Sequence, residues 1–152
     1  MASYHFHLTQ VKRSRGQSVI AQAAYRAGEK LYSTYYGESS DFTRKRGVVM
    51  AEICLPDHAP REYADRETLW NALEWAETGR KAQLAHSFDI TLMNEFSMEE
   101  NIEMARAFVQ EELVARGMIA DFAIHDPVRP KGAEPNPHIH ILVPIRPLKE
   151  DG

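Results

Sequence analysis

Hydrophobic and polar residues alternate along parts of the chain and follow a helical spacing along others. Alternation, or a short apolar run closed by turn residues, marks a strand. These patterns predict strands over 3–11, 48–55, 86–93, 118–125 and 137–145. Apolar residues three and four apart predict helices from Ser18 to about Leu31, after Asp57 or Asp65, and from Ser97 to Ala115. The polar, tyrosine-rich stretch 32–46 shows neither period and is predicted to be a loop.

Strands and helices alternate in this order until the end of the chain, where two strands follow each other. A connection of about a dozen residues separates that last pair, which makes them plausible antiparallel neighbours. The third helix has sharp ends: Ser97 and Glu100 form a capping box, and Gly117 is a stop. The order predicts one mixed α and β domain over residues 1–152.

Composition narrows the class of protein. The chain has 152 residues, of which 43% are hydrophobic and 26% charged, as in an ordinary globular domain with its own core. No apolar run approaches the roughly 18 residues of a membrane span. The beginning of the chain has no basic-then-apolar signal region, and the single Cys54 excludes an internal disulfide framework. We expect a cytoplasmic protein with no membrane partner.

Charge is unevenly distributed along the chain. The net charge of −4 argues at first against a nucleic-acid partner, but residues 1–46 carry +5 and the remainder −9. A locally positive field can recruit a polyanion, although solvated loop charges explain the same excess equally well. The basic residues of this segment are Lys12, Arg13, Arg15, Arg26, Lys30, Arg44, Lys45 and Arg46.

Three histidines form the strongest chemical signal. His138 and His140 lie two residues apart in a predicted strand, so they share one face about 7 Å apart. His125 ends the preceding strand, and antiparallel pairing in the right register would bring it to the same face. Three imidazoles with open coordination positions suit a catalytic metal rather than a structural one. A second pair, His5 and His7, is expected to support neighbouring groups or the fold.

Tyr25 is the candidate nucleophile. On the first predicted helix it falls roughly 140° from the centre of the apolar stripe, so it is not a core tyrosine by pattern. A phenol with a pKa near 10 is a weak nucleophile and needs a neighbouring charge or metal. The alternative is a surface tyrosine that packs on a loop. Farther along, Glu74 and Glu77 with Arg80 and Lys81 are typical of a solvated helix face.

Four segments, in this order and spacing, resemble the N-terminal relaxase domain of the MobA/MobL plasmid mobilisation proteins, within the HUH (His-hydrophobic-His) endonucleases. Each segment is a weak signal alone, and together they are specific. They are Tyr4-His5-Phe6; Gly16-Gln17-Ser18 with Ala23-Ala24-Tyr25-Arg26; Leu69-Trp70-Asn71 with Ala76-Glu77; and Ile124-His125 with Asn136-Pro137-His138-Ile139-His140.

The resemblance implies an α+β fold in which helices pack on a central antiparallel sheet of about five strands, with a metal centre at its middle. It implies a relaxase that nicks one DNA strand at a plasmid origin of transfer and forms a 5′-phosphotyrosine link. Tyr25 matches the catalytic tyrosine, and Glu77 matches an acidic position of the family. His125, His138 and His140 match the ligands of a divalent metal, Mg²⁺ or Mn²⁺.

The same resemblance sets the expected partners. We expect single-stranded origin DNA, accessory relaxosome proteins, and phosphate contacts near Tyr25 from Lys12, Arg13, Arg15 and Arg26. Two departures from the family stand out: the second His-x-His at His5 and His7, and the end of the sequence at Gly152, where family domains continue. The second departure predicts that the chain is the N-terminal part of a longer protein.

Rival functions remain open on the sequence alone. An HUH replication initiator or transposase would share the chemistry and differ in its DNA site. A non-catalytic single-stranded DNA-binding module would use the histidines structurally. A small-molecule metalloenzyme with a cupin-like barrel would need an all-β fold, against which the helix caps at Ser97 and Gly117 argue.

Overall fold

A computed structural model of the chain describes residues 6–92, 95–127, 132 and 136–146. Five strands form its central sheet, in the spatial order β1-β5-β7-β6-β4, and every neighbouring pair is antiparallel. The expected central antiparallel sheet is therefore confirmed. Its strands are β1 (Phe6–Lys12), β4 (Val48–Cys54), β5 (Gln83–Thr91), β6 (Ala120–His125) and β7 (His138–Pro144).

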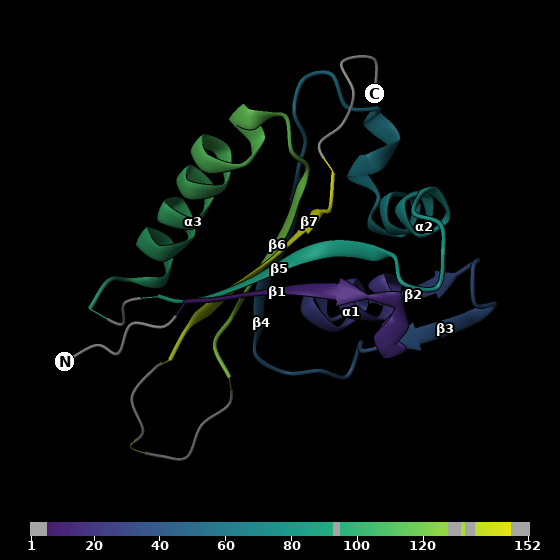
Figure 1. Cartoon of the computed structure of the whole chain (residues 1–152). Helices are drawn as coiled ribbons and strands as arrows, with labels where there is room; N and C mark the ends of the chain where they lie inside the picture. The colour runs from purple at the N-terminus through teal and green to yellow at the C-terminus, as the bar shows by residue number, and fades with distance from the viewer. Residues whose placement is uncertain (1–5, 93–94, 128–131, 133–135, 147–152) are drawn as a thin grey trace.

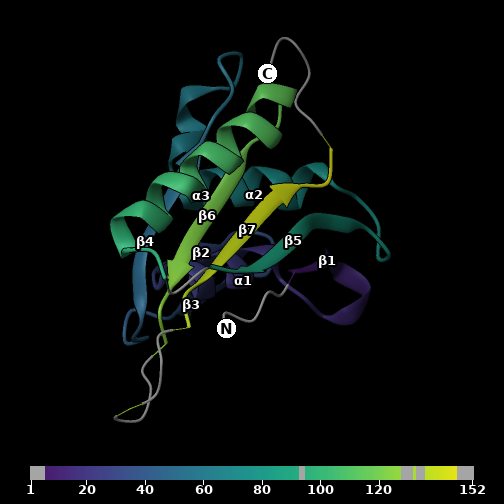
Figure 2. The ribbon, with the colours of Figure 1, turned by 90° about the vertical axis from the view of Figure 1, so that its left-hand side faces the viewer.

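Helices cover both faces of this sheet (Figures 1 and 2). On one face α1 (Val19–Ala27) and α2 (Arg66–Ala76) build a core around the fully buried Trp70. On the other face α3 (Met98–Glu112) builds a second core around the fully buried Phe122. The described residues also form three short 3-10 turns: η1 (Arg13–Arg15), η2 (Arg61–Ala64) and η3 (Val114–Arg116). None of the described helices is long and apolar enough to cross a lipid bilayer.

The helix starts follow the sequence signals closely. Asp65, rather than Asp57, is the N-cap of α2, because its carboxylate accepts a hydrogen bond from the backbone N–H of Thr68. Ser97 and Glu100 form the predicted capping box of α3. The end of this helix differs from the prediction: α3 ends at Glu112 rather than at Ala115, and Gly117 closes the following turn η3, in the left-handed conformation.

The first helix and the stretch after it differ from the prediction. Helix α1 ends at Ala27 because Gly28 takes the left-handed conformation, with φ 68°, and its N–H binds the carbonyl of Ala24. Leu31, expected to be helical, lies in β2 (Lys30–Ser33), which pairs with β3 (Glu38–Asp41) inside the predicted loop. The strand β3 is Glu-Ser-Ser-Asp, so no hydrophobic alternation announces it.

A buried ion pair joins α2 to the sheet. The guanidinium of Arg66 donates to both carboxylate oxygens of Asp121 on β6, at 2.8 and 2.9 Å, and the indole N–H of Trp70 donates to the same carboxylate at 2.8 Å. Each buried polar atom of this group thus has a partner, which removes most of its desolvation cost. These contacts hold α2 against β6, the strand that ends at His125.

Candidate metal and nucleophile site

Strand register brings the three predicted histidines together. His125 on β6 pairs directly with His138 on β7, and His140 follows two residues later on the same face. The ring centroids lie 4.3 Å apart for His125 and His140, and 6.2 Å apart for His138 and His140. The sequence predicted that the three histidines would lie together only if these two strands paired in the right register. The structure has that register.

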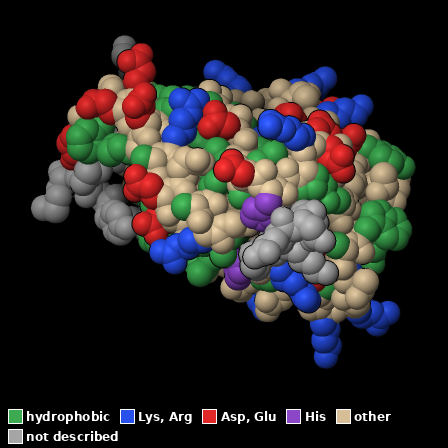
Figure 3. All heavy atoms as spheres, turned by 90° about the horizontal axis from the view of Figure 1, so that it is seen from above, with side chains coloured by type: hydrophobic (Ala, Val, Ile, Leu, Met, Phe, Trp, Pro, Cys, Tyr) green, Lys and Arg blue, Asp and Glu red, His purple; other side chains and the backbone are tan. Residues whose placement is uncertain are grey.

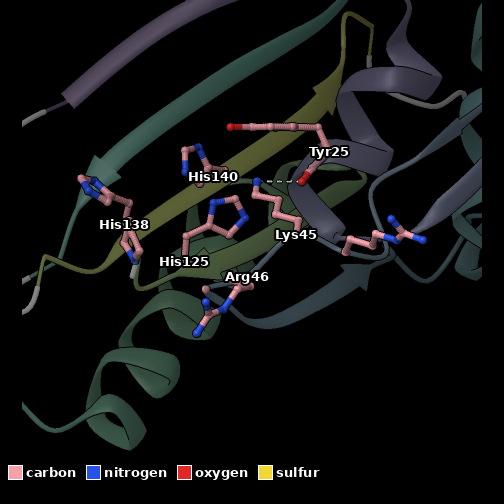
Figure 4. A pocket seen from close by; sticks show the side chains of 9 residues that line it. Tyr25, Lys45, Arg46, His125, His138 and His140 are labelled. Carbon is pink, nitrogen blue, oxygen red and sulfur yellow. Dashed lines mark hydrogen bonds between the residues drawn. The ribbon is translucent and has the colours of Figure 1, made fainter. Parts of the chain in front are cut away.

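Tyr25 lines the same cavity as these histidines. The cavity encloses about 560 Å³ and also has three consecutive basic residues in its wall. Figure 4 shows the phenol of Tyr25 extending from α1 over the cavity on the side of His140. Its side chain is 48% exposed, as expected for a position outside the apolar stripe of α1. A ligand that enters the cavity can therefore meet the phenol and the imidazoles together.

The backbone of α1 orients His125. The Nε2 atom of His125 lies 2.6 Å from the carbonyl oxygen of Arg26. A carbonyl can only accept, so Nε2 carries the proton and Nδ1 keeps its lone pair. Burial lowers the pKa of His125 to about 4, aided by the nearby charges of His140, Lys45 and Arg26, while the bond to the carbonyl opposes the shift. His125 is thus neutral at physiological pH, as a metal ligand must be.

Asp89 on β5 orients His140. Its carboxylate accepts a hydrogen bond from Nδ1 of His140, which leaves Nε2 available. This hydrogen bond lowers the pKa of Asp89. A carboxylate behind a histidine is the usual support of a histidine that binds metal. The sequence analysis did not identify Asp89. The only signal available was its position in the alternating segment 86–93, which limits its side chain to one of the two faces of a strand.

His7 lies on the other side of Asp89. In the register of the sheet, His7, Asp89 and His140 are opposite one another on three adjacent strands. The expected supporting position of His7 thus matches its placement beside the carboxylate that holds His140. His5 lies outside the described residues.

The donor chemistry of the trio fits a divalent cation. His125 offers Nδ1 and His140 offers Nε2, and in both rings the other nitrogen is already engaged. Within the described ranges, however, no three or more His, Cys, Asp or Glu side chains are arranged to hold a metal ion. A bond from zinc to a histidine nitrogen is about 2.1 Å long. Coordination of one cation by all three histidines at such a distance would therefore require their rings to turn toward a common point.

The segment between β3 and β4 supplies the basic wall of the cavity, and we call Arg44, Lys45 and Arg46 the basic lip. Sequence reasoning counted these residues in the positive excess but gave them no role. Gly47 holds the lip against β6, because its carbonyl accepts a hydrogen bond of 2.8 Å from the N–H of Asp126. Gly47 has φ +88°, and a Cβ there would lie 3.0 Å from the carbonyl oxygen of Asp126.

Arg13 does not join the site. Its guanidinium binds the fully buried carboxylate of Glu74 at 2.6 Å and the carbonyls of Glu74, Glu77 and Gly79 at the end of α2. The expectation that Glu74 belongs to a solvated helix face is therefore wrong. Lys12 and Arg15 flank Arg13 at the far end of β1. Lys12 lies five positions after His7 along the strand, or about 17 Å away.

Arg26 lies behind the site rather than in the cavity wall. Its guanidinium donates to the hydroxyl of Ser87 on β5 and to the side-chain oxygen of Gln22, both at 2.5 Å. Its carbonyl holds His125. The four cations expected near Tyr25 are thus replaced, along the cavity, by the basic lip.

Glu77 also lies elsewhere. It caps the end of α2, and its carboxylate pairs with Arg146 at 3.1 Å. It lines a separate cavity together with Pro144, at the opposite end of β7 from the histidines. Pro144 lies four positions after His140 along the strand, or about 13 Å away. The structure therefore does not bring Glu77 to Tyr25.

A family model described as the MobA/MobL family matches residues 17–152. The chain belongs to the MobA/MobL family. It is 38% identical to the conjugal transfer protein TraA of Agrobacterium fabrum and 36% identical to the probable mobilization protein MobA of Bifidobacterium longum. The matches cover 100% and 97% of this chain. The chain spans only 14% of the TraA protein and 26% of the MobA protein.

A solved structure gives the same assignment in three dimensions. It is described as the molecular basis of vancomycin resistance transfer in Staphylococcus aureus. The two chains superpose with a TM-score of 0.87 at 35% sequence identity, over 97% of this MobA/MobL chain and 73% of the other. The α+β architecture of this chain is therefore shared with that solved structure.

Proposed function

We propose that this MobA/MobL chain is a relaxase domain that nicks one strand of plasmid DNA at an origin of transfer. One observation carries the proposal: an exposed tyrosine on α1 and three histidines on β6 and β7 line a single cavity whose wall is basic. The relatives named for conjugal transfer and mobilisation support a role in the same process. Such DNA is cytoplasmic, and accessory proteins that expose the origin are expected partners.

The chain's own residues account for binding and attack. Arg44 and Arg46 of the basic lip bind DNA phosphates on the way into the cavity. The Oη atom of Tyr25 attacks the scissile phosphorus, and the bond from phosphorus to the 3′ oxygen breaks. The phenol proton is released and the 3′ oxygen takes up a proton, which leaves a free 3′-OH and a 5′-phosphotyrosine link. Because a phosphodiester replaces a phosphodiester, the 3′-OH can reverse the reaction and reseal the strand.

His125, His138 and His140 would hold the divalent metal that this chemistry calls for. When bound, a divalent cation stabilises the negative charge that develops on the phosphate oxygens. Asp89 and the Arg26 carbonyl keep His140 and His125 in the required tautomers. Mg²⁺ and Mn²⁺ are the ions to test first.

A labelled origin oligonucleotide tests the proposal. Incubation with Mg²⁺ or Mn²⁺ should give a covalent protein–DNA adduct that survives denaturing electrophoresis. Tyr25→Phe should abolish the adduct, because the substitution removes only the attacking oxygen. Tyr32→Phe is the matched control, since Tyr32 is similarly exposed, at 46%, and should leave the adduct in place.

Three results would overturn the assignment. An adduct that persists in Tyr25→Phe would show that another residue is the nucleophile. DNA binding without an adduct in the native chain, under both metals, would favour the non-catalytic DNA-binding module. An adduct on a replication or transposon origin, but not on an origin of transfer, would identify a different HUH enzyme.

A further inference from the structure

Lys45 of the basic lip makes two contacts with Tyr25. Its Nζ atom donates to the backbone carbonyl of Tyr25 at 2.8 Å and lies 3.4 Å from the centroid of the Tyr25 ring (Figure 4). A cation within about 6 Å of a ring centroid is attracted to the face of that ring. One ammonium group therefore fixes both the ring and the backbone of the same residue.

Phe42 is a second described neighbour of the Tyr25 ring. Tyr25 is 48% exposed, and Phe42 meets its ring edge-on, with centroids 5.3 Å apart and planes at 90°. An edge contact of this kind leaves the ring free to tilt about its Cβ–Cγ bond. Lys45 closes the face of the ring, and Lys45 and Phe42 both come from the segment that follows β3. The orientation of Tyr25 thus depends on this segment rather than on α1 alone.

We propose that Lys45 is a positioning residue, which holds the Tyr25 ring in the orientation from which its oxygen reaches a phosphate in the cavity. The proposal rests on the relaxase function proposed above. Arg44 and Arg46 line the same wall and would bind DNA, whereas Lys45 would act through Tyr25. A nucleophile displaced by about 1 Å can lose roughly a hundredfold in rate, so a single contact of this kind matters.

The charge of Lys45 makes the contact sensitive to pH. Burial, together with the nearby charge of Arg26, lowers the pKa of Lys45 to about 8. In the described part of the chain, the other charged or titratable groups that line the cavity are Tyr25 itself, the two arginines of the lip and the three histidines. As pH rises through about 8, Lys45 loses its proton and the attraction to the ring face weakens. The grip on Tyr25 is thus strongest below pH 8.

The kinetic test separates positioning from DNA binding. Lys45→Met keeps the length of the side chain and removes its charge. At saturating oligonucleotide, it should slow single-turnover adduct formation about tenfold or more, and Lys45→Arg should restore much of that loss. Arg44→Met is the comparator: it should weaken DNA affinity, measured by anisotropy. A Lys45→Met protein that loses affinity like Arg44→Met but keeps its rate at saturation would overturn the proposal.

A second measurement needs neither DNA nor metal. In protein labelled with ring-¹³C tyrosine, the Tyr25 signal can be identified by its loss in Tyr25→Phe. It should move as pH is raised through about 8 in the native chain and in Arg44→Met, but not in Lys45→Met. Equal behaviour in all three would overturn the contact. If no protein forms an adduct while the signal still follows Lys45, the contact stands and the relaxase function fails.

Discussion

Arg13 and the residues of the basic lip are all positively charged and come from the same basic third of the chain, but their surroundings in the fold differ. Arg13 is tied to Glu74, whose side chain is completely buried, and to three carbonyls at the end of α2. Arg44 and Arg46 face a cavity of about 560 Å³. A positive charge that is already paired within the fold cannot be removed without leaving a buried charge unpaired, whereas one that faces a cavity is available to a ligand.

The count of charges along the sequence hides this difference. Residues 1–46 carry a net +5, which indicates one basic region. Figure 3 shows acidic and basic side chains intermingled over the face that it displays. The positive charge that lines the cavity comes from three consecutive residues of the lip, so the position of each cation matters more than the sum.

The largest expected effect comes from Arg13→Met. Removing the guanidinium leaves the Glu74 carboxylate buried without its cation, so the free energy of unfolding should fall by about 3 kcal/mol. Urea unfolding measures it, with Arg15→Met as control, since Arg15 is exposed two residues away. A loss below about 1 kcal/mol would mean that Glu74 becomes protonated or hydrated, and the contrast with the lip would weaken.

Asp89→Asn should have the next largest effect, on metal rather than on folding. The amide cannot accept from Nδ1 of His140 as strongly as the carboxylate does, so metal affinity should fall by about 10- to 100-fold. Calorimetric titration with Mn²⁺ measures the change, and Asp57→Asn, on an exposed loop residue, is the control. Unchanged affinity would show that the ion binds without His140.

Arg44→Met and Arg46→Met should weaken DNA binding and leave stability nearly intact. Each phosphate contact that is lost should reduce the slope of log affinity against log salt by about 0.7 for a single strand. Anisotropy with a labelled oligonucleotide at several salt concentrations gives the slope. An unchanged slope in both variants would remove the lip from the DNA path, and with it the contrast with Arg13.

The smallest effect is expected for Arg15→Met. Arg15 is exposed on η1, about 17 Å or more along β1 from the row that contains His140. Stability should change by less than about 0.5 kcal/mol, and affinity for a short oligonucleotide that fills only the cavity should change less than for Arg44→Met. A larger loss than in Arg44→Met would show that DNA follows β1 toward η1.

The sequence predicted the side-by-side placement of the three histidines for a simple reason. The period of a strand places His138 and His140 on one face, and a short connection makes antiparallel pairing with the strand of His125 the natural choice. Both rules are local, and the register confirms them. Helix capping is an equally local signal. The sequence predicts Ser97 as a cap directly and Asp65 as one of two candidates, and the structure has both.

The errors concern contacts that join distant parts of the chain. Glu74 lies 61 residues from Arg13, so neither the burial of one nor the neutralisation of the other could be read from its neighbours. Lys45 and Phe42 reach Tyr25 only because the β2–β3 ribbon turns the chain back over α1, and β3 has no apolar pattern. Periodicity identifies elements, whereas the partner of a charged side chain depends on packing.

Gly47 ties the lip to the histidine strand so closely that the two cannot be altered independently. Any side chain at this position would press on Asp126 and Pro127, directly after His125. Efforts to redirect DNA preference by lengthening the connection between β3 and β4 should therefore insert residues before Arg44. The junction of the lip with β4 should be left unchanged. A change at the junction itself would disturb both the basic lip and the histidines of the proposed metal site in a single step.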